Sequence, residues 1–287
     1  MARIATATIF ALLAFAANSI LCRMALRVAT IDPLTFTSIR ILSGAITLGL
    51  LLLFRVRRVG LGGSWISALE LIGYAATFSV AYTALTAGTG ALLLFGAVQV
   101  VMIAAGYRAG ERINGAVATG WLAAVGGIIA LTLPSVSSPP LLSSFLMLLA
   151  GIAWGLYSLR GRSSSEPIAE TAGNFIRAVP IALILNALMF TKAFYTSRGV
   201  LLAGLSGALA SGLGYAAWYT ALPRMRSMTA ANLQLCVPVI AALFGALIFK
   251  EAITTRLIVA SIFVLGGVFI ATRGLATKKP PLAKPND

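Results

Sequence analysis

Long apolar runs, separated by short clusters of glycine, proline and charged residues, dominate the chain. A helix that crosses the hydrocarbon core of a bilayer needs roughly 20 mainly apolar residues, and ten runs come close to that length. They predict membrane-spanning helices at 4–26, 34–54, 66–86, 90–107, 114–133, 141–159, 170–190, 200–221, 228–249 and 256–273. Breakers such as 32–33, 55–60 and 134–140 mark the loops between them. We therefore expect an all-α integral membrane protein with ten transmembrane helices.

The chain repeats one set of landmarks in the same order. Tyr-Thr-Ala-Leu at 82–85 returns at 219–222, the glutamate at 111 returns at 251, and Gly-Gly at 126–127 returns at 266–267. A spacing of 137 to 140 residues each time indicates an internal duplication; chance similarity between apolar segments is the alternative. The predicted first repeat covers 1–136 and the second covers 137–275. A disordered cytoplasmic tail is expected at 276–287.

Each predicted repeat holds five helices, and this odd number determines how the two copies enter a membrane. The second copy must run opposite to the first, which gives a five-plus-five inverted repeat about an axis in the membrane plane. The same spacing pairs Arg40 with Arg177, one inside a predicted helix of each copy. Inverted repeats suit alternating access, because the two copies can exchange conformations and open one site to opposite sides.

The amino-acid composition is typical of a protein that is surrounded by lipid rather than by water. The 287 residues are 59% hydrophobic and only 10% charged, with a mean hydropathy of +0.97, whereas soluble domains are about 25% charged. The net charge of +15 could suggest a nucleic-acid partner, but the basic residues are scattered between apolar runs. Their positions in the loops indicate instead how the helices are oriented in the membrane. We expect a lipid bilayer and a small-molecule substrate as partners, and no nucleic acid.

The distribution of lysine and arginine predicts the orientation. With the amino terminus inside, cytoplasmic segments carry 14 of the 22 basic residues and outer segments carry six. Basic residues favour the cytoplasmic side of short loops. We therefore expect a multi-pass protein of the inner (plasma) membrane with both termini cytoplasmic.

Several of these landmarks resemble the drug/metabolite transporter superfamily, EamA type, over residues 5–273. The matching positions are Asn18, Pro33, Arg40 and Glu111 in the first half, and Trp154, Gly155, Arg177, Pro238 and Glu251 in the second. The chain departs from the family at position 99, where glutamine stands in place of the proline of the fourth helix. The segment 214–218 also resembles YddG-like exporters of aromatic amino acids, a group within this superfamily. The resemblance implies a ten-span membrane transporter.

Aromatic residues gather on single faces of three predicted helices. The residues at 74, 78 and 82 are spaced by four, so they share one helix face. Together with mid-span amides they could stack on a flat solute and hydrogen-bond its polar end. The expected substrate-binding residues are Asn18, Tyr74, Phe78, Tyr82, Gln99, Trp154, Tyr157, Tyr215, Trp218 and Asn232. The alternatives are an interfacial aromatic belt or core packing for the rings, and helix-to-helix hydrogen bonds for the amides.

Charged residues inside or beside the predicted helices have two possible roles. Arg40 and Arg177 could bind a carboxylate, or they could satisfy backbone carbonyls and reach toward the membrane surface. Glu111 and Glu251 are expected to cap helix ends or to pair with a nearby arginine, Arg112 or Arg256. The remaining candidate, the carboxylate at 70, lies near the cytoplasmic face rather than at mid-membrane. We therefore expect facilitated diffusion, or coupling that uses no carboxylate proton relay.

The residues that catalysis and metal binding usually require are scarce. The sequence has no histidine, and its two cysteines lie in separate apolar runs without metal-ligand spacing. We expect no enzyme activity, no cofactor and no metal site, although a lipid-modifying membrane enzyme or a channel remain alternatives. The function we expect is alternating-access transport of amino acids, with aromatic ones favoured, as an exporter or facilitator. Other small amphipathic metabolites or drugs are the alternative substrates, and a monomer or weak homodimer is expected.

Overall fold

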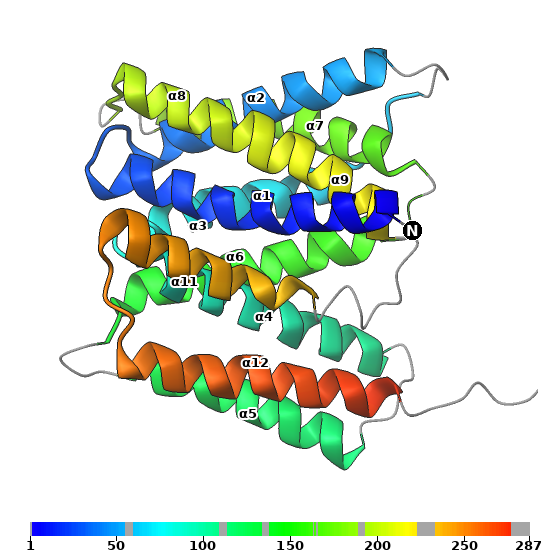
Figure 1. The fold of residues 1–287 in the computed structure, drawn as a ribbon. Helices are drawn as coiled ribbons and strands as arrows, with labels where there is room; N and C mark the ends of the chain where they lie inside the picture. The colour runs from blue at the N-terminus through cyan, green and yellow to red at the C-terminus, as the bar shows by residue number, and fades with distance from the viewer. Residues whose placement is uncertain are drawn as a thin grey trace, which may run out of the picture.

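The computed structural model describes residues 2–54, 60–108, 114–133, 138–162, 164, 166–188, 193–222 and 233–276. Within these residues the secondary structure is helical (Figure 1). The helices are α1 (Ala2–Arg27), α2 (Pro33–Leu53), α3 (Trp65–Ala81), α4 (Ala87–Arg108), α5 (Gly115–Thr132), α6 (Leu141–Gly161), α7 (Pro167–Leu188), α8 (Ser197–Leu205), η2 (Ser206–Leu213), α9 (Gly214–Ala221), α11 (Cys236–Phe249) and α12 (Thr255–Ala276). The expected all-α fold is therefore confirmed.

Seven helices of the described chain are long and apolar enough to cross a membrane, counting Ser197–Ala221 as one. The apolar helices Trp65–Ala81, Cys236–Phe249 and Thr255–Ala271 are shorter. Most helix ends lie within a few residues of the predicted positions, but α3 stops at Ala81, five residues before the predicted end at 86. Residues 223–232, where the ninth helix was expected to begin, lie outside the described residues. The ten-span inverted repeat and its division at 136–137 remain predictions.

Side chains at the loop boundaries explain where several helices begin. Asp32 caps α2, its carboxylate accepting hydrogen bonds from the backbone N–H groups of Leu34 and Thr35, and Pro33 occupies the first helical position. Proline suits this position because its missing N–H has no partner there in any case. Ser64 caps α3 and Thr196 caps α8 in the same way. The breaker at 32–33 therefore acts as a helix cap.

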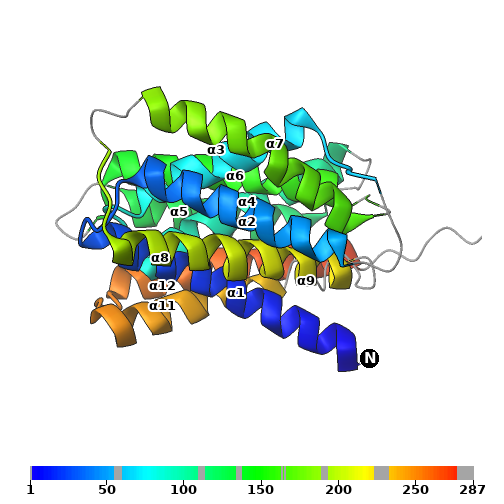
Figure 2. The same cartoon turned by 90° about the horizontal axis from the view of Figure 1, so that it is seen from above.

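The helices run side by side as a single bundle (Figures 1 and 2). The amino terminus and the end of α12 lie at the same end of this bundle, at the right of Figure 1. At one edge, α12 packs along α5. A Cβ added to Gly120 would meet the backbone oxygen of Gly267, and one added to Gly267 would meet the backbone oxygen of Gly120. Small residues let these two backbones approach closely, as they do in many membrane helix pairs.

The span Ser197–Ala221 changes its winding halfway along. It begins as α8, becomes the π-helix η2 and returns to α-helical winding in α9. Successive hydrogen-bonded turns of a π-helix join residues five apart, and π-helical segments occur often at functional sites. Ser206 and Ser211 are separated by one such turn, so both hydroxyls face the same side. That side packs against α1 and α2.

Candidate functional site

Aromatic side chains from α3, α6 and α9 meet in the interior of the bundle. Trp154 of α6 is their centre: its ring lies 5.0 Å from that of Tyr74 on α3, 4.8 Å from Tyr215 on α9 and 5.6 Å from Tyr157. Centroid distances of 4.5–7 Å are those at which aromatic pairs attract each other. All four rings are buried. The structure thus brings together rings that the sequence placed on three separate helix faces.

Two further phenylalanines complete this aromatic cluster and were missed by the sequence analysis. Phe15 of α1 makes edge contacts with Trp154 at 5.9 Å, Tyr215 at 5.9 Å and Trp218 at 5.6 Å. Phe175 of α7 contacts Tyr215 at 5.7 Å. The position of Phe15 carried a usable signal, because it precedes Asn18 by three residues and such residues share a helix face.

A chain of hydrogen-bonded side chains borders the aromatic cluster. Asn18 of α1 donates to the Tyr74 hydroxyl at 3.0 Å and accepts from the Ser206 hydroxyl at 2.7 Å. Arg40 of α2 donates from Nη2 to Tyr74 at 2.9 Å and from Nε to Ser211 at 3.1 Å. Both serines come from η2, so the π-helical turn supplies the hydroxyls for an amide on α1 and a guanidinium on α2. We call Asn18, Arg40, Tyr74, Ser206, Ser211 and Tyr215 the polar network.

Arg40 is the cation of the polar network, and only 1% of its surface is exposed. Its guanidinium lies 5.0 Å above the ring of Tyr74 and 5.2 Å above that of Phe78, within cation–π range. A third hydroxyl, that of Tyr215, lies 3.5 Å from Nη2. Its buried Nη1 atom has no hydrogen-bond partner in the part of the chain that the structure describes. Reaching toward the membrane surface, one role expected for Arg40, is ruled out by this burial.

Arg177 on α7 has the other expected role. Its Nη1 donates to the backbone oxygens of Gly62 at 2.6 Å and Gly173 at 3.0 Å. The side chain is half-buried. Gly63 follows with φ of +83°, a value that glycine adopts without strain. Arg177 therefore fastens the loop before α3 to α7.

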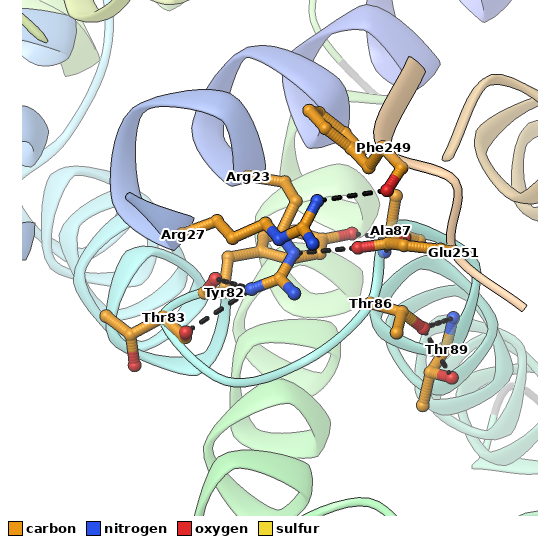
Figure 3. Close-up of polar contacts among 9 residues, drawn as sticks. All are labelled: Arg23, Arg27, Tyr82, Thr83, Thr86, Ala87, Thr89, Phe249 and Glu251. Atoms are coloured by element: carbon orange, nitrogen blue, oxygen red, sulfur yellow. Dashed lines mark hydrogen bonds and ion pairs between the residues drawn. The ribbon is translucent and has the colours of Figure 1, made fainter. Parts of the chain in front are cut away.

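A cluster of polar contacts ties three segments together at one end of the bundle (Figure 3). Arg23 of α1 pairs with Glu251 of the α11–α12 turn, with 2.9 Å between Nε and Oε1 and 9% of each side chain exposed. Arg23 also donates to the backbone oxygens of Tyr82 and Thr83, at 3.2 and 3.3 Å. Glu251 accepts from the N–H of Ala87, the first residue of α4, at 2.9 Å. We call the Arg23–Glu251 pair with these contacts the clamp.

The clamp corrects one expectation about Glu251. The residue does cap a helix, but its observed cation is Arg23, 228 positions away in sequence, rather than the neighbouring Arg256. Arg256 donates instead to the backbone oxygen of Ala130 on α5. Glu111, expected to take an equivalent role, lies outside the described residues.

A second ion pair lies toward the opposite end of the bundle. Arg160 near the end of α6 and Glu70 near the start of α3 are joined at 2.8 Å. The Arg160 side chain is 51% exposed, while that of Glu70 is 11% exposed. Exposed ion pairs contribute little to stability because water screens them. This pair is therefore a weaker connection than the clamp.

The remaining predicted residues are distributed around these features. Tyr82 is buried, contacts Phe78 at 4.7 Å between ring centres and donates to the backbone oxygen of Ala87 at 3.3 Å. Gln99 is buried on α4, a helix that packs against α6. Asn232 lies outside the described residues. None of the rings that form the aromatic cluster lies in an exposed interfacial belt.

Comparisons with known proteins agree with one another. Residues 141–273 match the model of the EamA-like transporter family. The chain is 50% identical to an uncharacterised protein of Pseudomonas aeruginosa over 262 residues, 91% of each chain. It is 21% identical to the uncharacterised transporter YoaV of Bacillus subtilis, covering 87% of this chain and 90% of that one. It is 25% identical to a probable amino-acid metabolite efflux pump of Escherichia coli, covering 73% and 78%.

The fold also matches a solved structure described as "Crystal structure of protein". The TM-score is 0.67 at 18% identity, and the match covers 93% of this chain and 98% of the other. At this identity the likeness shows a shared fold.

Proposed function

We propose that this chain, whose residues 141–273 match the EamA-like transporter family, is a secondary transporter of amino acids, with aromatic ones favoured, in the inner (plasma) membrane. The match to this family, and the relatives named as a transporter and an efflux pump, support a multi-pass membrane protein that transports a small molecule. The amino-acid substrate, its aromatic character and the route through the protein are our proposal. The observation that carries it is the aromatic cluster around Trp154, which lies directly against the polar network.

The aromatic cluster and the polar network together fit the two ends of an aromatic amino acid. The rings of Tyr74, Trp154 and Tyr215 supply faces and edges on which a flat side chain can stack. The hydroxyls and the Asn18 amide supply hydrogen bonds for the polar end. The name of the Escherichia coli relative, a probable amino-acid metabolite efflux pump, supports the same substrate class.

Alternating access requires the interior to open toward one side at a time, and the clamp is suited to control one opening. It joins α1 to the α11–α12 turn, which belong to different predicted halves. Opening that end separates a buried ion pair, and each ion must then regain water or another partner. The distribution of lysine and arginine predicts that this end lies outside, with both termini cytoplasmic. We propose transport by a single chain or a weak homodimer, as an exporter or facilitator.

Facilitated diffusion is the proposed mode of energy use. A proton-coupling carboxylate works best where desolvation shifts its protonation equilibrium. In the described chain the polar network contains no carboxylate, and Glu70 and Glu251 are each held by an arginine at the ends of the bundle.

A second substrate class is favoured by one observation. The aromatic cluster is built of neutral rings, so it would also accommodate other small amphipathic metabolites or drugs. Such solutes need less polar contact than an amino acid does.

Uptake into liposomes that contain the purified protein tests the proposal. We expect phenylalanine and tryptophan to equilibrate without a pH gradient, and threonine, lysine and glutamate to enter much more slowly. Trp154→Leu should reduce phenylalanine uptake by about tenfold or more, because the ring contacts are lost. Trp121→Leu is the matched control, since Trp121 on α5 is 38% exposed on the bundle surface.

Two results would contradict this proposal. If amphipathic drugs were taken up and none of the amino acids were, the substrates would be drugs rather than amino acids. Accumulation that requires a proton gradient, and that is lost in a folded Glu70→Gln variant, would overturn facilitated diffusion.

A further inference from the structure

We propose that the polar network is an anion site, in which the guanidinium of Arg40 binds the carboxylate of the transported solute. The inference rests on the proposed function and narrows it: the substrate must carry a carboxylate, and an ammonium group is not what selects it. Three features of the described residues support this, namely charge, donor count and location.

The first feature is a buried positive charge without a counter-charge. Arginine stays protonated in proteins, so burial cannot neutralise it. In the described chain the partners of Arg40 are hydroxyls and rings: Ser211, Tyr74, Tyr215 and the face of Phe78. Hydroxyls and π faces compensate a buried cation only partly, whereas a carboxylate would neutralise it.

The second feature is an excess of hydrogen-bond donors. The Nη1 atom of Arg40 is buried and has no acceptor within the described residues. The Tyr74 hydroxyl already accepts from both Asn18 and Arg40, so its own proton points to another acceptor. The Tyr215 hydroxyl also accepts from Arg40, at a long 3.5 Å. Even with one of these tyrosines donating to the other, at least one of the two O–H groups has no acceptor within the described residues.

A carboxylate supplies the acceptors that this arrangement needs. Its two oxygens can take parallel hydrogen bonds from an arginine and still accept from a neighbouring hydroxyl. A neutral hydroxyl or an ammonium group cannot do this, because the first has one oxygen and the second only donates. The chemistry of the site therefore selects an organic anion.

The third feature is location. The polar network draws α2 and α3 from the first predicted half and η2 and α9 from the second. Tyr74 and Tyr215 belong both to the network and to the aromatic cluster around Trp154. A carboxylate held at Arg40 would thus place an attached ring against Trp154. Movement of the halves against each other would open the site and change the contacts of Arg40.

Arg177 shows what an arginine with a structural role looks like in the same bundle. Its guanidinium donates to two backbone oxygens and is half-exposed. Arg40 instead points its unmatched donor into a closed interior. This difference makes Arg177→Gln the matched control for Arg40→Gln.

An analogue series on the unmodified protein is the first test, so that no variant needs to fold. We would measure binding in detergent and uptake in liposomes for phenylalanine, 3-phenylpropionate, which lacks the ammonium group, and phenethylamine and phenylalaninol, which lack the carboxylate. Phenylalanine and 3-phenylpropionate should bind, and the two analogues without a carboxylate should bind about a hundredfold more weakly. Equal binding of phenethylamine would overturn the inference while leaving transport intact.

The variants then assign the effect to Arg40. Arg40→Gln should lose the preference for 3-phenylpropionate over phenylalaninol, Arg40→Lys should keep part of it, and Arg177→Gln should keep all of it. Failure of the proposed function looks different: phenylalanine is not transported, yet 3-phenylpropionate still raises the melting temperature of the unmodified protein and not of Arg40→Gln. An unchanged preference in a folded Arg40→Gln protein would overturn the carboxylate site.

Discussion

Arg40 and Arg177 lie 137 residues apart, and so do Arg23 and Arg160, so each pair occupies matching positions in the predicted halves. The two members of each pair have different surroundings. Arg40 is buried and binds side chains of the polar network, and Arg23 is buried and binds the Glu251 side chain in the clamp. Their counterparts Arg177 and Arg160 are more exposed, and Arg177 binds backbone oxygens. Matching positions in a sequence repeat therefore need not have matching roles.

The difference has a physical meaning if the protein works by alternating access. In an inverted repeat held in one state, the two halves adopt different conformations, so that one end is closed while the other is not. The clamp, with its buried ion pair, has the features of a closed end, and the exposed Arg160–Glu70 pair has those of a looser one. The comparison can be tested by changing one member of each pair.

Replacing Arg40 should produce the largest effect and should separate function from stability. In Arg40→Met we expect transport to fall about a hundredfold or more, because the substrate loses its charged partner. Thermal stability should stay the same or rise, since replacing buried charged groups by apolar ones is often neutral or stabilising. Liposome uptake and the melting temperature of the purified protein measure the two effects. A strongly destabilised Arg40→Met protein would indicate a structural arginine.

Breaking the clamp should produce the next effect, at one end of the bundle. Glu251→Gln leaves Arg23 without its counter-charge, and breaking such a buried pair costs roughly 3–5 kcal/mol. Cys22, which is buried beside Arg23 on α1, should then react with a membrane-permeable maleimide at least about tenfold faster. The exposed Cys236 is first replaced by serine so that it does not contribute.

Arg160→Gln is the matched control for the clamp. It removes an exposed cation, and such pairs contribute about 0–1 kcal/mol. We expect no change in the labelling of Cys22. Equal acceleration in the two variants would mean that the clamp does not hold its end closed.

Replacing Arg177 should have the smallest effect of the three. Arg177→Met removes the hydrogen bonds to the backbone oxygens of Gly62 and Gly173. A hydrogen bond from a charged donor contributes about 1.5–3 kcal/mol to stability. The loss here should be smaller, because water can reach this half-buried site and replace part of the interaction. The melting temperature should fall while the affinity for phenylalanine stays unchanged. Loss of affinity in a folded Arg177→Met protein would remove the distinction between the two arginines.

The sequence predicted the helices well and the connections between them poorly. Apolar run length and the breaker at Asp32 and Pro33 place helix ends closely, because both act locally. The shared face of Tyr74 and Phe78 was predictable for the same reason. The Arg23–Glu251 pair was not, because nothing in a single sequence relates residues 228 positions apart.

The η2 segment was unpredictable for a different reason. Ser206 and Ser211 face the same way only because the chain winds as a π-helix there, and α-helical spacing would direct them to different sides. The sequence leaves two roles open for Arg40, and the evidence on them comes from its neighbours in space rather than in sequence.

The close packing of α5 against α12 has a consequence for biosynthesis. The ribosome completes α5 before the second predicted half is made, whereas α12 is the last helix of the described chain to emerge. The surface of Gly120 that later contacts Gly267 must therefore face lipid, or the insertion machinery, until α12 has been made. Final closure of the bundle waits for the end of the chain, so a truncation that removes α12 leaves α5 without its main packing partner.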